Sequence, residues 1–219
     1  AVFPLFEELP GIKVVYGMPE WVELPELNAA VLCVPAAGVS RLLEENWKPE
    51  PDERFRYNIL AVHGVLQGIT AYEYTPFFLP MSRVLDDRWD YIALGDYHDF
   101  RKVSHNGAYA GATEFTTTNI WGENREKGWV LVEIEKGKPP LIRHQTVPTR
   151  RVLTLPDIDA GQCASTDEVI ERVLAEAGQE DVTDALVRVR VLNLPYSERA
   201  RVPRAIVEGL AIAFHVQVD

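Results

Sequence analysis

Asn58-Ile-Leu-Ala-Val-His63-Gly64 is an apolar run that stops abruptly at a histidine and a glycine. The pattern recurs in Trp89-Asp-Tyr-Ile-Ala-Leu-Gly95, which continues directly into Asp96-Tyr97-His98-Asp99. Short apolar runs bounded by turn residues are typical of buried strands. In α/β sheets, ligands gather where strands stop, because side chains there project from a rigid frame. The two runs therefore predict an α/β sheet with a functional edge.

The segments around these runs indicate further strands and one short helix. We expect buried strands at Ile12–Tyr16 and Ala29–Val34, because both runs are β-branched and bounded by Gly or Pro. A short helix is expected at Ser40–Glu45. Later in the chain, the pattern predicts a short strand at Tyr109–Thr113 and a hairpin of Lys127–Ile134 with Leu141–Val147.

The character of the sequence changes at about Pro148. Ser165 and Glu168 form a capping box that opens an amphipathic helix, and Leu186–Val191 alternates like a half-exposed strand. A second helix is expected at Arg204–Ala213, with Pro203 in its first turn. Strand–helix–strand–helix order predicts a separate α+β unit, so we divide the chain into residues 1–147 and 148–219.

The composition is that of an ordinary globular protein. Among the 219 residues, 47% are hydrophobic and 25% are charged. No run approaches the ~20 apolar residues that a membrane span needs, and residues 1–10 do not resemble a signal peptide. Cys33 and Cys163 fit neither a disulfide framework nor a zinc motif, which favours a cytoplasmic protein. The net charge of −11 counts against a broad basic surface for nucleic acid, but not against phosphate chemistry through bound cations.

Three side chains at the expected sheet edge are candidate metal ligands. A single histidine such as His63 is more often a hydrogen-bonded core residue, and Asp96-Tyr97-His98 taken alone is equally well a polar turn. Together they favour a site, because Asp96 and His98 are two residues apart and project to the same side of an extended segment. A carboxylate with imidazoles suits manganese, zinc or iron. Asp99 is the candidate acceptor that orients His98.

Positive charge concentrates in the last third of the chain. Arg150, Arg151, Arg188 and Arg190 are candidate DNA-binding residues. A patch that faces phosphate and a solvated surface with internal ion pairs explain these arginines equally well.

The motifs as a set resemble a known family. Ile-Leu-Ala-Val-His63-Gly64, Asp90-Tyr-Ile-Ala-Leu-Gly95-Asp96-Tyr97-His98, Tyr109-Ala-Gly-Ala-Thr113, Trp121-Gly-Glu and Lys127-Gly-Trp-Val-Leu-Val-Glu-Ile resemble, in order and spacing, the second half of SbcD-type nucleases. These are calcineurin-like metallophosphoesterases that serve in DNA double-strand-break repair. Residues 1–147 resemble part of the family's β-sandwich flanked by helices, and residues 148–219 resemble its DNA-capping subdomain.

The resemblance implies a metal-dependent DNA nuclease with two divalent ions, for which Mn²⁺ is the expected metal. His63 matches the histidine that binds the second metal, and His98 matches a ligand of the first. Asp96 departs from the family's Gly-His-x-His motif, because it stands where the family has a histidine. The implied partners are DNA, an SbcC-type ATPase and a second copy of the chain.

A larger departure is the absence of the family's earlier motifs. Asp-x-His, Gly-Asp and Gly-Asn-His-Asp should come first and carry the bridging carboxylate and the catalytic histidine. The sequence has no Gly-Asn-His-Asp, and the Asp96–His98 segment is placed as the late motif. We therefore assign no catalytic residue and expect the chain to be inactive alone. The alternatives are a small-molecule phosphodiesterase of the same fold and a non-catalytic scaffold for a partner ATPase.

Overall fold

The structure, a computed structural model, describes residues 3–43, 47–69, 78–116, 120–123 and 125–219. The chain divides into two compact units. Unit 1 comprises residues 1–119 and 123–147, and unit 2 comprises residues 120–122 and 148–219. One division between the units falls between Val147 and Pro148, and residues 120–122, which were expected in the first part of the chain, cluster with unit 2. Both units contain strands and helices, so the expected mixed α/β class is confirmed at that level.

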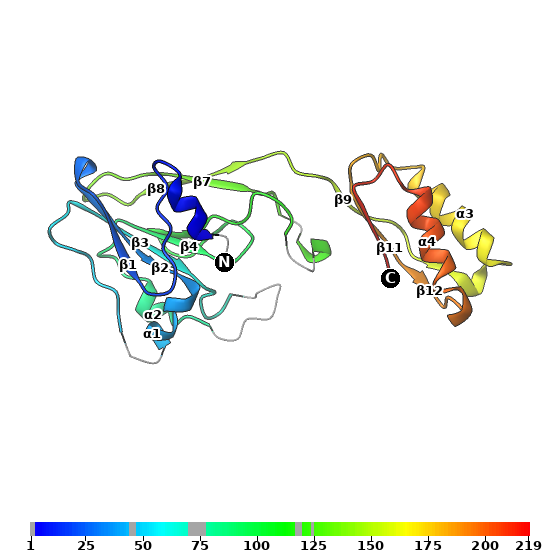
Figure 1. Ribbon diagram of the computed structural model, residues 1–219, viewed down its shortest axis with the longest axis horizontal. Coiled ribbons are helices and arrows are strands. Elements are labelled where there is room, and N and C mark those ends of the chain that lie inside the picture. Colours follow the sequence, from blue (N-terminus) through cyan, green and yellow to red (C-terminus); the bar gives the residue numbers. More distant parts are fainter. Residues whose placement is uncertain (1–2, 44–46, 70–77, 117–119, 124) are drawn as a thin grey trace. The chain divides into compact units, whose positions relative to one another are not determined.

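Unit 1 is built on a mixed sheet (Figure 1). Its neighbouring strands are, in order, β1 (Glu20–Leu24), β2 (Ala29–Val34), β3 (Tyr57–His63), β4 (Tyr91–Gly95), β6 (Gly107–Tyr109) and β5 (Arg101–Lys102). Strands β2, β3, β4 and β6 run parallel, whereas β1 and β5 are antiparallel to their neighbours. The carboxyl ends of β3 and β4 therefore lie at one edge of the sheet.

The core of unit 1 lies on one face of this sheet. Leu60, Val62, Ile92 and Leu94 alternate along β3 and β4 and are buried there, together with Trp89. The short helices α1 (Ser40–Leu43) and α2 (Met81–Val84) each contribute a buried residue to the same cluster. Residues 44–45 of the helix expected at Ser40–Glu45 lie outside the described residues.

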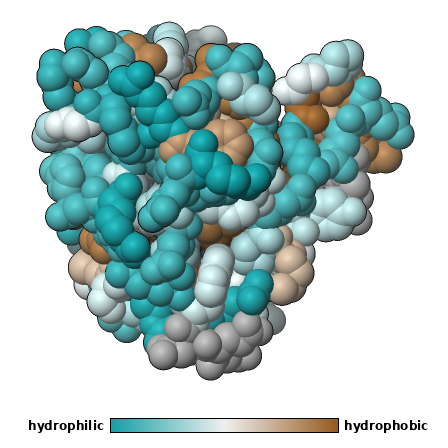
Figure 2. All heavy atoms as spheres, turned by 90° about the vertical axis from the view of Figure 1, so that its left-hand side faces the viewer, coloured by the Kyte–Doolittle hydropathy of each residue, from teal (hydrophilic) through white to brown (hydrophobic). Residues whose placement is uncertain are grey.

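A hairpin completes unit 1. Strands β7 (Gly128–Glu133) and β8 (Leu141–Thr146) pair antiparallel, which confirms the predicted hairpin. On the side of unit 1 that faces the viewer in Figure 2, hydrophilic residues predominate and the hydrophobic areas are small and separate.

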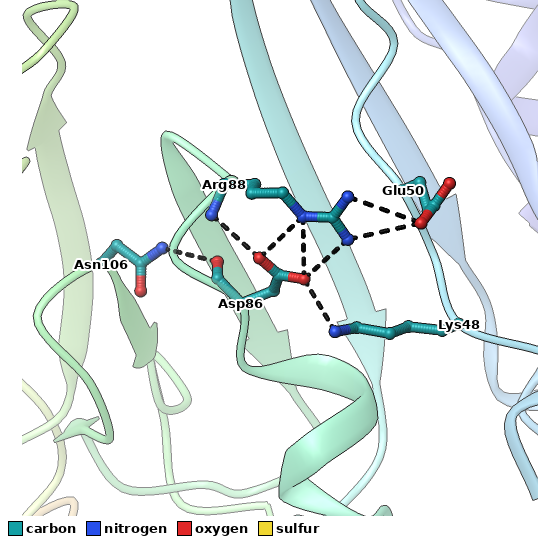
Figure 3. A network of polar contacts seen from close by, with 5 residues as sticks. All are labelled: Lys48, Glu50, Asp86, Arg88 and Asn106. Atoms are coloured by element: carbon teal, nitrogen blue, oxygen red, sulfur yellow. Dashed lines mark hydrogen bonds and ion pairs between the residues drawn. The ribbon is translucent and has the colours of Figure 1, made fainter.

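A polar network lies where β3, β4 and β6 begin, before their first residues in the chain (Figure 3). The Asp86 carboxylate accepts hydrogen bonds from Arg88, with Nη2–Oδ2 at 2.9 Å, and pairs with Lys48 Nζ at 2.9 Å. Arg88 also reaches Glu50, and Asn106 Nδ2 donates to the Asp86 carbonyl at 3.1 Å. The network joins the loops at the amino ends of the strands.

Unit 2 is a small α/β layer structure. The sheet has the order β13-β11-β9, with parallel strands β13 (His215–Val218), β11 (Leu186–Val189) and β9 (Val152–Thr154). A separate parallel pair joins β10 (Ile158–Asp159) to β12 (Val191–Leu192). Helices α3 (Thr166–Ala177) and α4 (Arg201–Gly209) pack side by side over the sheet (Figure 1). Ser165 caps α3, because its Oγ accepts a hydrogen bond from Glu168 N at 3.2 Å, as the capping box predicts.

Short 3-10 helices connect these elements: η1 (Phe3–Glu8), η2 (Pro25–Leu27), η3 (Ala36–Gly38), η4 (Ile120–Gly122), η5 (Ala160–Gln162) and η6 (Tyr196–Glu198). No helix within the described ranges combines the length and the apolar character that a membrane crossing requires.

Two strand predictions were wrong. Ile12–Tyr16 forms no strand: Ile12 and Tyr16 are exposed, and Val15 lies in the lining of a cavity. The strand expected at Tyr109–Thr113 ends at Tyr109. Gly111 has a φ of 80°, and the chain turns there instead of extending.

Candidate functional site

His63 and Asp96 come together at the carboxyl edge of the unit 1 sheet. His63 is the last residue of β3 and pairs in register with Gly95, the last residue of β4. Asp96 follows directly, and its Oδ1 lies 3.6 Å from His63 Nε2. Both side chains are exposed, His63 to 54% and Asp96 to 40%. The parallel register therefore places two of the three candidate metal ligands, His63 and Asp96, beside each other, and the pair does not extend to a group of three within the described residues.

The backbone at this edge is closely constrained. Asp96 has a φ of 89°, a region that residues with a side chain rarely occupy. Gly95 passes close to the imidazole, since a Cβ at this position would lie 3.3 Å from His63 Nδ1. Strained backbone of this kind persists only where the surrounding structure holds it, and it is often found at functional sites.

Tyr109 fixes the segment that follows His63. Its hydroxyl donates to the Gly64 carbonyl at 2.8 Å and accepts from Leu66 N at 2.9 Å. Burial raises the pKa of Tyr109 to about 12, so the group stays protonated and keeps both hydrogen bonds at neutral pH. The buried tyrosine, the last residue of β6, thus holds the turn after β3 from two strands away in the sheet.

His98 lies in a different polar environment. Its Nδ1 is 3.4 Å from Thr116 Oγ1 and 3.9 Å from Glu123 Oε1. The His98 carbonyl accepts hydrogen bonds from Ala112 N and from Lys127 Nζ, both at 3.0 Å. Both the ring and the backbone of His98 are therefore held by residues that come later in the chain.

A buried cluster of charges lies beside His98. The side chains of Lys127 and Glu123 are 0% exposed and that of Asp99 is 1% exposed. Lys127 Nζ is paired with Glu123 Oε2 and lies 3.3 Å from Asp99 Oδ1. Arg125 Nε approaches Asp99 Oδ2 at 3.8 Å. Buried charges are costly unless they are paired, so movement that separates Lys127 from its carboxylate partners is unfavourable. The cluster therefore holds the segment around His98 in place.

Glu123 and Lys127 were not singled out as site residues from the sequence. The signal available was their i,i+4 spacing in Trp121-Gly-Glu-Asn-Arg-Glu-Lys127-Gly-Trp129, where charges stand among aromatic residues and glycines. The predicted role of Asp99 in orienting His98 stays a prediction, and the contacts of its carboxylate include Lys127 and Arg125.

The fit of a divalent ion depends on the distance between possible ligand atoms. Ligands about 2.1 Å from a cation lie about 3 Å apart when they are adjacent in its coordination shell. The 3.6 Å between His63 Nε2 and Asp96 Oδ1 therefore fits two neighbouring ligands after a small movement. Among the residues that the structure describes, no group of three or more His, Cys, Asp or Glu side chains is arranged to hold a metal ion. The pair supplies part of a coordination shell.

A cavity of about 500 Å³ opens beside this pair, on the sheet face opposite the core. Its floor is apolar, and His63 and Gly95 lie in its wall together with Lys13 and Cys33. Cys33 is a free thiol, and burial raises its pKa, so it stays protonated at neutral pH. The cavity offers apolar contact next to the candidate ligand pair.

The four candidate DNA-binding arginines of unit 2 are each paired with an aspartate. Arg150 meets Asp184 at 3.2 Å, Arg151 meets Asp181 at 2.6 Å, Arg188 meets Asp219 at 2.5 Å and Arg190 meets Asp157 at 2.7 Å. Of the two explanations left open by the sequence, this pairing favours the solvated surface with internal ion pairs. A phosphate group would have to compete with an aspartate at every one of these positions.

Comparison of the chain with protein-family models and with curated proteins found no match. The resemblance to SbcD-type nucleases therefore depends on the motifs quoted above and on the arrangement of the residues that carry them.

Proposed function

We propose that this chain is part of a metal-dependent phosphodiesterase of the SbcD type, a DNA nuclease within a calcineurin-like fold. The observation that carries the proposal is the 3.6 Å approach of His63 Nε2 to Asp96 Oδ1 at the ends of adjacent parallel strands. An imidazole and a carboxylate at this distance are suitable ligands for Mn²⁺.

The residues have separate roles in this proposal. His63 and Asp96 hold one cation from two neighbouring strands, and His98 contributes a further imidazole from the loop that follows β4. Divalent ions would supply Lewis-acid polarisation of the phosphodiester and charge neutralisation in its displacement. Tyr109 keeps the turn after His63 in place, so the ligand pair does not have to be ordered when a cation binds.

Metal binding is the measurement that tests this proposal, because the earlier motifs of the family are absent from the sequence. We expect calorimetric titration of the 219-residue chain with Mn²⁺ to show stoichiometric binding that His63→Ala and Asp96→Ala each remove. His105→Ala is the matched control, since His105 Nδ1 also lies 3.6 Å from an aspartate, Asp87, but outside the sheet edge. Unchanged binding in the His63 and Asp96 variants would overturn the proposal.

A small-molecule phosphodiesterase is the second candidate, and a specific observation favours it. The paired arginines of unit 2 and the net charge of −11 offer little free positive charge to a DNA backbone. Fluorescence anisotropy with duplex and single-stranded DNA separates the candidates. The nuclease proposal expects binding that weakens with salt and is reduced in Arg151→Ala, whereas Mn²⁺ binding without DNA binding favours the small-molecule enzyme. If the chain binds neither Mn²⁺ nor DNA, the remaining alternative is a scaffold that binds a partner ATPase.

A further inference from the structure

A cavity of about 500 Å³ lies within unit 2, beside the amino end of α4. Arg199 stands two residues before α4 and Pro203 lies in its first turn, and both line the cavity. Val191, Leu194 and Val218 form an apolar part of the wall. Pockets for small molecules have volumes of about 300–1,000 Å³ and combine apolar walls with a few polar groups. This cavity meets both conditions.

Arg199 differs from the other arginines of unit 2. Each of the others pairs with an aspartate or a glutamate: Arg150, Arg151, Arg172, Arg188, Arg190, Arg201 and Arg204. Among the described residues no carboxylate pairs with Arg199, whose guanidinium carbon lies 5.7 Å from the centre of the Tyr196 ring. A guanidinium group carries five N–H donors in a planar fork that matches a carboxylate or a phosphate. Arg199 therefore has donors available to an anion in the cavity.

The other two polar residues of the wall are already engaged within the protein. The Asp219 carboxylate pairs with Arg188 Nε at 2.5 Å, which offsets its charge. Asn193 Nδ2 donates a hydrogen bond to Asp159 Oδ1 at 2.9 Å. The charge that a ligand would meet in the cavity is therefore that of Arg199.

The amino end of α4 contributes charge of the same sign. The helix has nine residues, no side chain caps its amino end, and no acidic residue stands in its first turn. The helix dipole places roughly half a positive charge at such an end, which attracts anions. The guanidinium group and the helix end thus favour an anion at the same side of the cavity.

We propose that this cavity binds a small molecule that carries a carboxylate or a phosphate on an apolar body. The anionic group pairs with Arg199 at the amino end of α4, and the body contacts Val191, Leu194 and Val218. Covering these apolar side chains adds a favourable contribution that inorganic phosphate alone lacks. The site lies in unit 2 and does not depend on the proposed metal ligands of unit 1.

NMR titration of the 219-residue chain tests the proposal with two anionic probes, phenylacetate and phenyl phosphate. In ¹H–¹⁵N spectra we expect saturable shifts of the Val191, Leu194 and Val218 amides with at least one probe, and the stronger of the two identifies the preferred anion. Arg199→Gln should raise its dissociation constant about 10–100-fold, as expected for loss of hydrogen bonds to a charged group. Arg204→Gln is the matched control, because Arg204 is 81% exposed on α4 and pairs with Glu208, and it should leave the affinity unchanged.

Two comparisons on the wild-type chain decide the proposal even if Arg199→Gln does not fold. Phenylacetamide lacks the charge and inorganic phosphate lacks the apolar body, so both should bind more weakly than the preferred anionic probe. Equal binding of phenylacetamide and phenylacetate would refute the role of the anion, and the absence of saturable shifts with both anionic probes would refute the site. His63→Ala, which tests the proposed function in unit 1, should leave this binding unchanged, so either proposal can fail without the other.

Discussion

Replacing Lys127 with methionine is expected to lower the free energy of unfolding of unit 1 by about 3–5 kcal/mol. The Lys127 ammonium group is the cation shared by two buried carboxylates, Glu123 and Asp99, and it also donates to the His98 carbonyl. Methionine has a similar length and no charge, so the variant leaves both carboxylates buried without their common partner. Breaking a buried ion pair from one side typically costs about 3–5 kcal/mol. Arg125 lies 3.8 Å from Asp99 and offsets only part of the loss, because its side chain is 67% exposed.

Urea denaturation followed by tryptophan fluorescence measures this change. The tryptophans of unit 1 are Trp21, Trp47, Trp89 and Trp129, whereas unit 2 contains Trp121, so the signal reports mainly on unit 1. Lys138→Met is the control, since Lys138 pairs with Glu135 while 65% exposed and should change stability by less than about 1 kcal/mol.

A double variant tests the cause of the destabilisation. Glu123→Gln combined with Lys127→Met removes the charge of one of the two carboxylates that lose Lys127, so we expect the double variant to be more stable than Lys127→Met alone. A Lys127→Met variant within 1 kcal/mol of wild type, with an unchanged dependence on urea, would refute the argument that this cluster holds the His98 segment.

Three further changes test other parts of unit 1. Tyr109→Phe removes the hydroxyl that joins Gly64 to Leu66, and we expect urea denaturation to show a loss of about 1–3 kcal/mol, whereas no loss would mean that these hydrogen bonds are replaced. Hydrogen bonds from Arg88, and after them from Lys48, hold the pKa of Asp86 well below its usual range, so the stability that Asp86 contributes is present above about pH 4 and is lost as the pH falls further. Thermal unfolding between pH 5 and pH 2 should therefore depend less on pH in Asp86→Asn, and an equal pH dependence would show that other carboxylates dominate. Asp96→Gly places a glycine where φ is 89°, so we expect the free energy of unfolding to rise by about 1 kcal/mol. The same variant should lose Mn²⁺ binding in calorimetric titration. If only one of the two effects is seen, Asp96 either is not strained or is not a metal ligand.

The strands that position the site could be predicted from the sequence because their signals are local. The apolar runs before His63 and Gly95 are each long enough for one strand, and each stops at the residue where the structure ends the strand. Parallel pairing of two such runs then places His63 beside Asp96. The hairpin of β7 and β8 followed in the same way from two alternating runs around a Gly–Lys–Pro turn.

The surroundings of His98 could not be predicted in this way, because they depend on contacts between distant segments. Gly111 turns the chain after β6, and Gly128 N then donates to the Ala112 carbonyl at 3.0 Å. That hydrogen bond brings Lys127 beside the His98 carbonyl, which no local pattern indicates. Likewise, the arginines of unit 2 were visible in the sequence, but their aspartate partners come from other loops and, for Arg188, from Asp219.

Trp121 has a consequence for how this protein can be divided experimentally. Residues 120–122 belong to unit 2 although unit 1 continues on both sides of them in the chain. Trp121 Nε1 donates to Gln217 Oε1 at 2.8 Å, and the guanidinium carbon of Arg188 lies 5.9 Å from the centre of the indole ring. A fragment expressed from Pro148 onward would therefore lack an indole that covers its own sheet, and its solubility and stability would understate those of the intact unit. A tethered design that carries residues 120–122 ahead of Pro148 would restore that cover.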